Sequence, residues 1–65
     1  MDNNTTSETL LTMKDVEARL QLGHTKVQEL VISGKLPSLK IGKSRRVRLV
    51  DLNTFIEELV IQENL

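Results

Sequence analysis

Residues 35–48 have the sequence KLPSLKIGKSRRVR, and this stretch decides the predicted fold. It contains six basic residues and no acidic one, although the whole chain has nine of each sign and a formal net charge of zero. Apolar residues alternate with polar ones on both sides of a turn at Gly42–Arg45, which is typical of a two-stranded hairpin. We expect its basic side chains to lie mostly on one face and at the tip. The apolar side chains expected to face inward are Leu39, Ile41, Val47 and Leu49.

Helical periodicity flanks this hairpin on both sides. Thr12 and Asp15 form a capping-box pattern ahead of an apolar stripe that predicts a helix over residues 13–20. Similar spacing predicts a second helix over 24–33 and a third over 50–61. The order helix, tight turn, helix, hairpin, helix predicts an α+β, mostly α, fold of the small winged helix-turn-helix type.

The composition limits how this fold is held together. The chain has 65 residues, no Cys and one aromatic residue, Phe55, so we expect one domain with a small aliphatic core and no disulfide. The domain is predicted over residues 10–61, with a disordered tail at 1–9 and a frayed end at 62–65. No apolar run approaches the ~20 residues of a membrane span, and the N-terminus lacks a secretory pattern. We therefore expect a soluble cytoplasmic protein without membrane contact.

Seven short motifs follow one another along the chain. They are LTMKDV (11–16), LQLG (20–23), VQEL (27–30), SGKLP (33–37), KIGK (40–43), RVR (46–48) and DLNTF (51–55). As an ordered set over residues 10–60, they resemble the excisionase-type branch of the MerR-like winged helix-turn-helix family. SGKLP leading into KIGK is the most specific part, because it combines a helix stop, a turn and a strand. Gly23 and Gln28 depart from the family pattern, which often has a Ser or Thr cap and an aromatic there, so base preference does not transfer.

The resemblance and the charge pattern together imply three groups of DNA-binding residues. In this family the second helix enters the major groove, and its exposed residues here are His24, Thr25, Lys26, Gln28 and Glu29. Of these, Lys26, Gln28 and Glu29 suit guanine, adenine and cytosine respectively. The wing would bind phosphates and the minor groove through Lys40, Lys43, Ser44, Arg45, Arg46 and Arg48. Thr12 and Lys14 could hold a phosphate at the start of the first helix. The alternative for each group is an ordinary solvated surface.

Chemistry beyond binding has little support in the residues. His24 is the single histidine and has no cysteine to complete a metal site. Ser33, Ser44 and Thr25 lack the base that would activate a nucleophile. We therefore expect no enzymatic activity, no metal, no cofactor and no small-molecule ligand.

Three functions remain open at this point. The first is a recombination directionality factor that binds and bends double-stranded DNA and promotes excision of a phage or mobile element by an integrase, either a tyrosine or a serine recombinase. Such a nucleoid-associated protein would associate cooperatively on adjacent sites. The second is a small MerR-like transcriptional regulator, which shares the same chemistry. The third is a protein-interaction module, such as an antitoxin fragment, whose charges only aid solubility.

Overall fold

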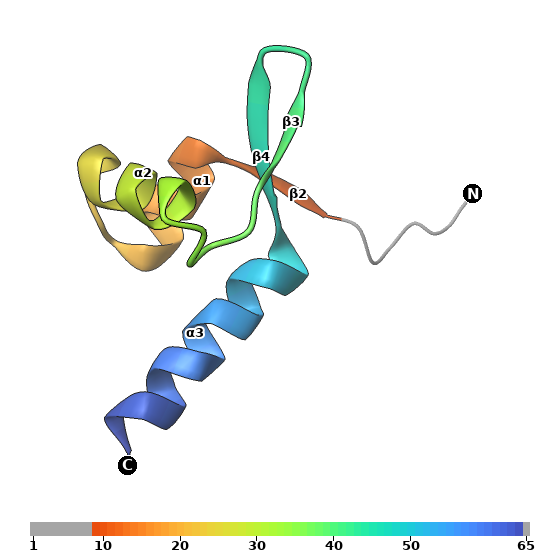
Figure 1. Ribbon diagram of the computed structural model, residues 1–65. Helices are drawn as coiled ribbons and strands as arrows, with labels where there is room; N and C mark the ends of the chain where they lie inside the picture. Colours follow the sequence, from red (N-terminus) through yellow and green to blue (C-terminus); the bar gives the residue numbers. More distant parts are fainter. Residues whose placement is uncertain (1–8, 65) are drawn as a thin grey trace.

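A computed structural model describes residues 9–64 (Figure 1). The elements in chain order are β2 (Leu10–Thr12), α1 (Met13–Leu20), α2 (His24–Ile32), β3 (Leu39–Ile41), β4 (Ser44–Arg48) and α3 (Leu49–Glu63). This arrangement confirms the predicted α+β winged helix-turn-helix architecture. Of the tail predicted at residues 1–9, residues 1–8 lie outside the described residues, as does residue 65. Thr9 accepts a hydrogen bond at its carbonyl from the Leu49 N–H at 2.9 Å, and α3 extends two residues beyond its predicted end at 61.

The sheet contains a strand that the sequence pattern did not predict. β2 pairs antiparallel with β4, with Leu11 opposite Val47, so the strand order is β2-β4-β3. β2 is only three residues long and runs directly into α1, so it is too short to display an alternating pattern. Because β4 has a neighbour on each side, the hairpin is joined through backbone hydrogen bonds to the helix-turn-helix unit.

The pairing register corrects the predicted orientation of the hairpin side chains. The turn is two residues long, at Gly42 and Lys43, and it pairs Ile41 with Ser44 and Leu39 with Arg46. Gly42 has a φ of 61°, a left-handed conformation that such a tight turn needs. Residues that are directly opposite each other on paired strands share a face of the sheet, and successive residues of one strand alternate between faces. Leu39 and Ile41 therefore lie on the face of the sheet that does not carry Val47.

Burial agrees with this register. Val47 is fully buried, whereas Ile41 is 53% exposed. Leu49 belongs to the first turn of α3 and packs against the core from there. The prediction that all four apolar side chains of the hairpin face inward is therefore wrong for Leu39 and Ile41, because a two-residue turn puts them on the outer face.

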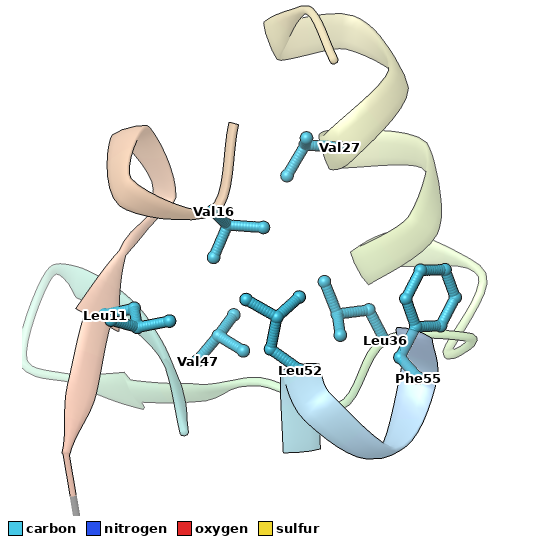
Figure 2. Packing of buried hydrophobic residues seen from close by; sticks show 7 residues of the cluster. All are labelled: Leu11, Val16, Val27, Leu36, Val47, Leu52 and Phe55. Carbon is cyan, nitrogen blue, oxygen red and sulfur yellow. The ribbon is translucent and has the colours of Figure 1, made fainter. Parts of the chain in front are cut away.

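One small apolar core connects the three helices, β2, β4 and the loop after α2 (Figure 2). Its buried members are Leu11, Val16, Val27, Leu36, Val47, Leu52 and Phe55. Leu36 is the member from the loop after α2, and it is fully buried. Its N–H donates to the Leu30 carbonyl at 3.0 Å, while Gly34 takes a φ of 81°. This left-handed glycine ends α2 and turns the chain so that Leu36 enters the core.

The C-terminal half of α3 extends away from the core. Figure 1 shows it projecting beyond the sheet and the other helices. Leu52 and Phe55 are buried, but Leu59, Val60 and Ile61 are 43%, 52% and 57% exposed. Within the part of the chain that the structure describes, only the first half of the predicted apolar stripe of α3 therefore packs against the core. None of the helices in residues 9–64 is long and apolar enough to cross a bilayer.

Candidate nucleic-acid interface

The start of α1 is fixed by a reciprocal cap. The Asp15 N–H donates to Thr12 Oγ1 and the Thr12 N–H donates to Asp15 Oδ2, each at 3.0 Å, as the capping-box pattern predicts. The backbone hydrogen bond from Thr12 is the main reason that the pKa of Asp15 lies below its ordinary value. Thr12, predicted to hold a phosphate, is thus already engaged in capping through its side-chain oxygen. Lys14 is exposed beside it.

The turn between α1 and α2 is tight. Gln21 adopts a left-handed conformation with a φ of 56°, and its N–H and that of Leu22 both donate to the Glu17 carbonyl. Gly23 is the N-cap of α2 and supplies no capping side chain. The first-turn N–H groups of α2 therefore lack a side-chain acceptor from the cap, and a helix N-terminus of this kind favours a nearby anion.

Helix geometry divides the surface of α2 into two sides. Val27 is buried, and helical spacing places His24, Gln28 and Ile32 in a row at i, i+4 and i+8. This row borders a groove of about 470 Å³ that is also lined by Arg45 of β4 and Met13 of α1. The structure thus brings together two residues predicted on the recognition helix and one predicted on the wing. Arg45 Nη1 donates to Ser38 Oγ at 2.7 Å, which steadies the guanidinium at the edge of the groove.

Lys26 lies on the other side of α2. It borders a second groove, of about 440 Å³, together with Leu30 of α2, Lys35, and Phe55 of α3. Its Nζ lies 3.9 Å from Glu29 Oε1, and both side chains are about two-thirds exposed. The predicted guanine reader therefore faces α3, away from the groove that Gln28 shares with the wing. Thr25 is exposed on the surface of α2 between these two sides.

The basic side chains of the wing divide between two faces. Lys40 and Arg45 are paired across the hairpin, on the face that also carries Val47 and borders α2. Arg46 lies on the opposite face, between Thr12 and Leu39. Lys43 is in the turn at the tip, and Ser44 follows it at the start of β4. The prediction that these bases lie mostly on one face is wrong, because successive residues of β4 alternate between faces.

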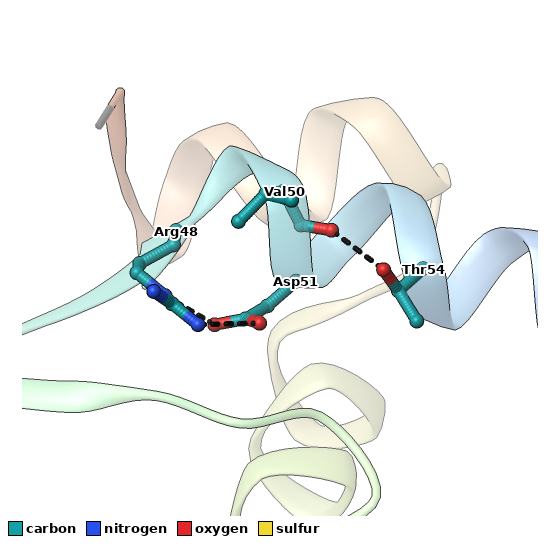
Figure 3. A network of polar contacts seen from close by, with 4 residues as sticks. All are labelled: Arg48, Val50, Asp51 and Thr54. Carbon is teal, nitrogen blue, oxygen red and sulfur yellow. Dashed lines mark hydrogen bonds and ion pairs between the residues drawn. The ribbon is translucent and has the colours of Figure 1, made fainter. Parts of the chain in front are cut away.

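Arg48 lies at the base of the wing, where β4 runs into α3 (Figure 3). Its Nε donates to Asp51 Oδ2 at 2.7 Å and its Nη2 donates to Asp51 Oδ1 at 3.0 Å. Of the residues predicted to bind DNA through the wing, Arg48 is thus the one whose guanidinium is held by a carboxylate of the chain itself. Its position favours a structural role in joining the wing to α3.

One contact within the helix-turn-helix unit was not predicted. His24 Nδ1 lies 3.0 Å from Glu17 Oε2, so the first residue of α2 is joined to α1 across the turn. The two residues are seven positions apart, and only the left-handed turn at Gln21 brings them together. No sequence signal pairs them. Within residues 9–64, no group of three or more His, Cys, Asp or Glu side chains is arranged to hold a metal ion.

The paired helices, the wing and the groove between them define a winged helix-turn-helix protein, a class that places its second helix in the major groove of DNA. The family model described as a helix-turn-helix domain matches residues 10–60. A "Probable excisionase" of Saccharopolyspora erythraea is 34% identical over 55 residues, which cover 85% of this chain and 56% of that protein. An "Excisionase" of Streptomyces ambofaciens is 39% identical over 54 residues, which cover 83% of this chain and 87% of that protein.

The chain belongs to the helix-turn-helix family, and within it to the excisionase type. This confirms the resemblance inferred from the ordered motifs. The match spans little more than half the length of the Saccharopolyspora relative but most of the Streptomyces one. No solved structure matches the chain.

Proposed function

We propose that the protein is a recombination directionality factor, which binds double-stranded DNA and thereby promotes excision of a phage or mobile element by an integrase. The observation that carries this proposal is the groove shared by α2 and the wing, in which His24, Gln28 and Arg45 converge. Two relatives named as excisionases support the recombination role. The protein would act on cytoplasmic DNA by binding and bending it, and the cleavage and joining of strands would belong to the integrase.

The side chains divide into those that read bases and those that bind phosphates. Thr25 and Gln28 are exposed on α2, and the Gln28 carboxamide suits the paired donor and acceptor of adenine in the major groove. Arg45 and its cross-strand partner Lys40 would bind the phosphates that pass between α2 and the wing. Lys43, at the tip, would reach the adjacent minor groove.

Other residues predicted to bind DNA lie outside the groove between α2 and the wing, and any contact they make would be with the DNA backbone. Lys14 would contact a phosphate beside the start of α1, and Lys26 would contact the backbone from the α3 side of α2. Glu29 is the least suited to contact DNA, since a carboxylate is repelled by phosphate unless it finds a donor. Its closest such partner is Lys26, at 3.9 Å.

A single domain of this size buries only about 600–1,000 Å² of protein surface on DNA, which gives limited specificity. We therefore propose that copies bind side by side and cooperatively. The projecting half of α3 supports this proposal: its exposed Leu59 and Val60 lie among Glu57, Glu58 and Glu63, with no basic residue from 49 to 65. The surface is complementary in charge to the wing of a neighbouring copy.

The DNA-binding geometry is tested by comparing Arg45→Ala with Arg46→Ala. Both changes remove one positive charge from adjacent residues of β4, but only Arg45 borders the groove beside α2. Arg45→Ala should weaken binding to a labelled duplex by about 1 kcal/mol or more and reduce the slope of log K against log salt by about one. Arg46→Ala should have a clearly smaller effect. Equal losses would contradict the assignment of the groove to DNA.

The recombination role is tested by deleting the gene in a strain that carries the element. Excision should fall sharply while integration continues, and the wild-type gene should restore excision where an Arg45→Ala gene restores less. Unchanged excision with altered transcription of neighbouring genes would instead support the regulator. An absence of DNA binding in the titration would support the protein-interaction module.

A further inference from the structure

His24 is held in a defined orientation by a residue of the preceding helix. Its Nδ1 lies 3.0 Å from Oε2 of Glu17, across the turn that joins α1 and α2. The Glu17 side chain is 23% exposed, whereas the His24 side chain is 64% exposed. The carboxylate is therefore largely covered, and the rest of the imidazole remains open to solvent. This contact fixes which edge of the ring is available to a ligand.

Counting donors and acceptors defines what that edge can bind. A carboxylate only accepts hydrogen bonds, so the Nδ1 of His24 carries a proton in this contact. Nε2 is then a bare acceptor when the imidazole is neutral and a donor when the ring carries both protons. A phosphate also only accepts. One imidazole can therefore donate to Glu17 and to a phosphate at the same time only as the imidazolium.

The surroundings of His24 make the groove suitable for an anion. His24 and Gln28 of α2 line this groove together with Arg45 of β4, and its other lining residues are apolar: Met13, Val31 and Ile32. The charged groups around the imidazole are thus Glu17 of α1, in contact with Nδ1, and Arg45 of β4, which lines the same groove, and Gln28 on its own helix is neutral. Arg45 disfavours a second cation nearby, and a phosphate between the two would remove that repulsion.

We propose that His24, oriented by Glu17, binds a DNA phosphate as the imidazolium, so that DNA binding takes up a proton. This inference rests on the proposed function, because the phosphate belongs to the DNA strand between α2 and the wing. The bound form carries one proton more than the neutral imidazole, so DNA affinity would depend on pH. Glu17 is a positioning residue in this scheme and does not touch the DNA.

The test measures binding of the full chain to a fluorescently labelled, mixed-sequence duplex at pH 6 and pH 8 and constant ionic strength. Wild-type protein should bind on the order of five-fold more tightly at pH 6. His24→Gln should lose most of this difference while remaining folded by circular dichroism. Glu17→Gln should reduce the difference as well, since its neutral amide stabilises the imidazolium less. Arg19→Gln, also a change from a charged side chain to an amide, lies on the exposed surface of α1 at a residue with no proposed contact. It is the matched control and should keep the wild-type response.

Calorimetry measures the proton directly. Titrations at pH 7 in two buffers with different ionisation enthalpies should show net proton uptake for the wild type and clearly less for His24→Gln. Equal pH dependence and equal proton uptake in the two proteins, with both still binding DNA, would overturn the inference. Weaker wild-type binding at pH 6 would also overturn it, because a neutral His24 would then accept a hydrogen bond from a base. Failure of every variant to bind DNA at either pH would contradict the proposed function instead.

Discussion

Arg48 and Asp51 join the end of the wing to the start of α3 through two parallel hydrogen bonds, of 2.7 and 3.0 Å. Arg48 is the N-cap residue of α3 and Asp51 lies in its first turn. The carboxylate therefore neutralises the guanidinium and also suits the positive end of the helix dipole. This pair lies at the point where α3 leaves the sheet.

Replacing Asp51 with Asn should lower stability more than it lowers DNA affinity. The Arg48 side chain is 42% exposed, so solvent screens the pair and its loss should cost about 1 kcal/mol or less in unfolding free energy. Urea unfolding measures this cost. Affinity for a mixed-sequence duplex should change less than two-fold, because removing this carboxylate alters no proposed phosphate contact. A large loss of DNA affinity with unchanged stability would show that the pair belongs to the DNA surface.

The faces of the hairpin are tested by shortening one side chain on each. Val47→Ala removes two methyl groups from the core and should lower the unfolding free energy by about 2 kcal/mol. Ile41→Ala removes more carbon atoms but from a side chain that is 53% exposed, so its cost should stay near 0.5 kcal/mol. The comparison uses urea midpoints of the two variants. A larger cost at Ile41 would contradict the register.

Much of this fold could be predicted from the sequence, and the exceptions have physical causes. The start of α1 follows from its cap at Thr12, and Gly34 marks the end of α2, since both signals are local. β2 could not be predicted because three residues carry no periodicity, and it forms by pairing with distant β4. The face on which Leu39 lies depended on the number of residues in the turn, because adding or removing one residue there shifts the pairing register by one and moves side chains to the other face.

Site residues could be named from the sequence more readily than grouped. Exposed α2 residues and basic wing residues were identified by type and position. The sequence did not show which of them share a groove: Lys26 and Gln28 are two positions apart, and a helix turns about 200° over that distance. Pairs such as Arg48 with Asp51, or His24 with Glu17, depend on how one element ends and the next begins.

Stability should fall in acid partly through Asp15. Hydrogen bonds from Thr12 hold the pKa of Asp15 below its ordinary value of 3.8. A lowered folded pKa gives stability that is present above the unfolded pKa and is lost as pH falls through the folded one. Urea midpoints should therefore fall less steeply below about pH 4 in Asp15→Asn, which keeps an acceptor but cannot titrate there. Identical slopes in the two proteins would show that the cap has no role in acid unfolding.

Sequence preference should depend on Gln28 more than on Lys26. Gln28 borders the groove shared with the wing, whereas Lys26 faces α3 and lies 3.9 Å from Glu29. A binding-site selection with Gln28→Ala should lose preference at one position of the site, a discrimination of about 1–3 kcal/mol for a bidentate base contact. Lys26→Ala should keep the selected sequence and weaken binding to all duplexes alike, with a shallower salt dependence. The reverse result would mean that the α3 side of α2 enters the major groove, and the orientation proposed for the domain on DNA would be wrong.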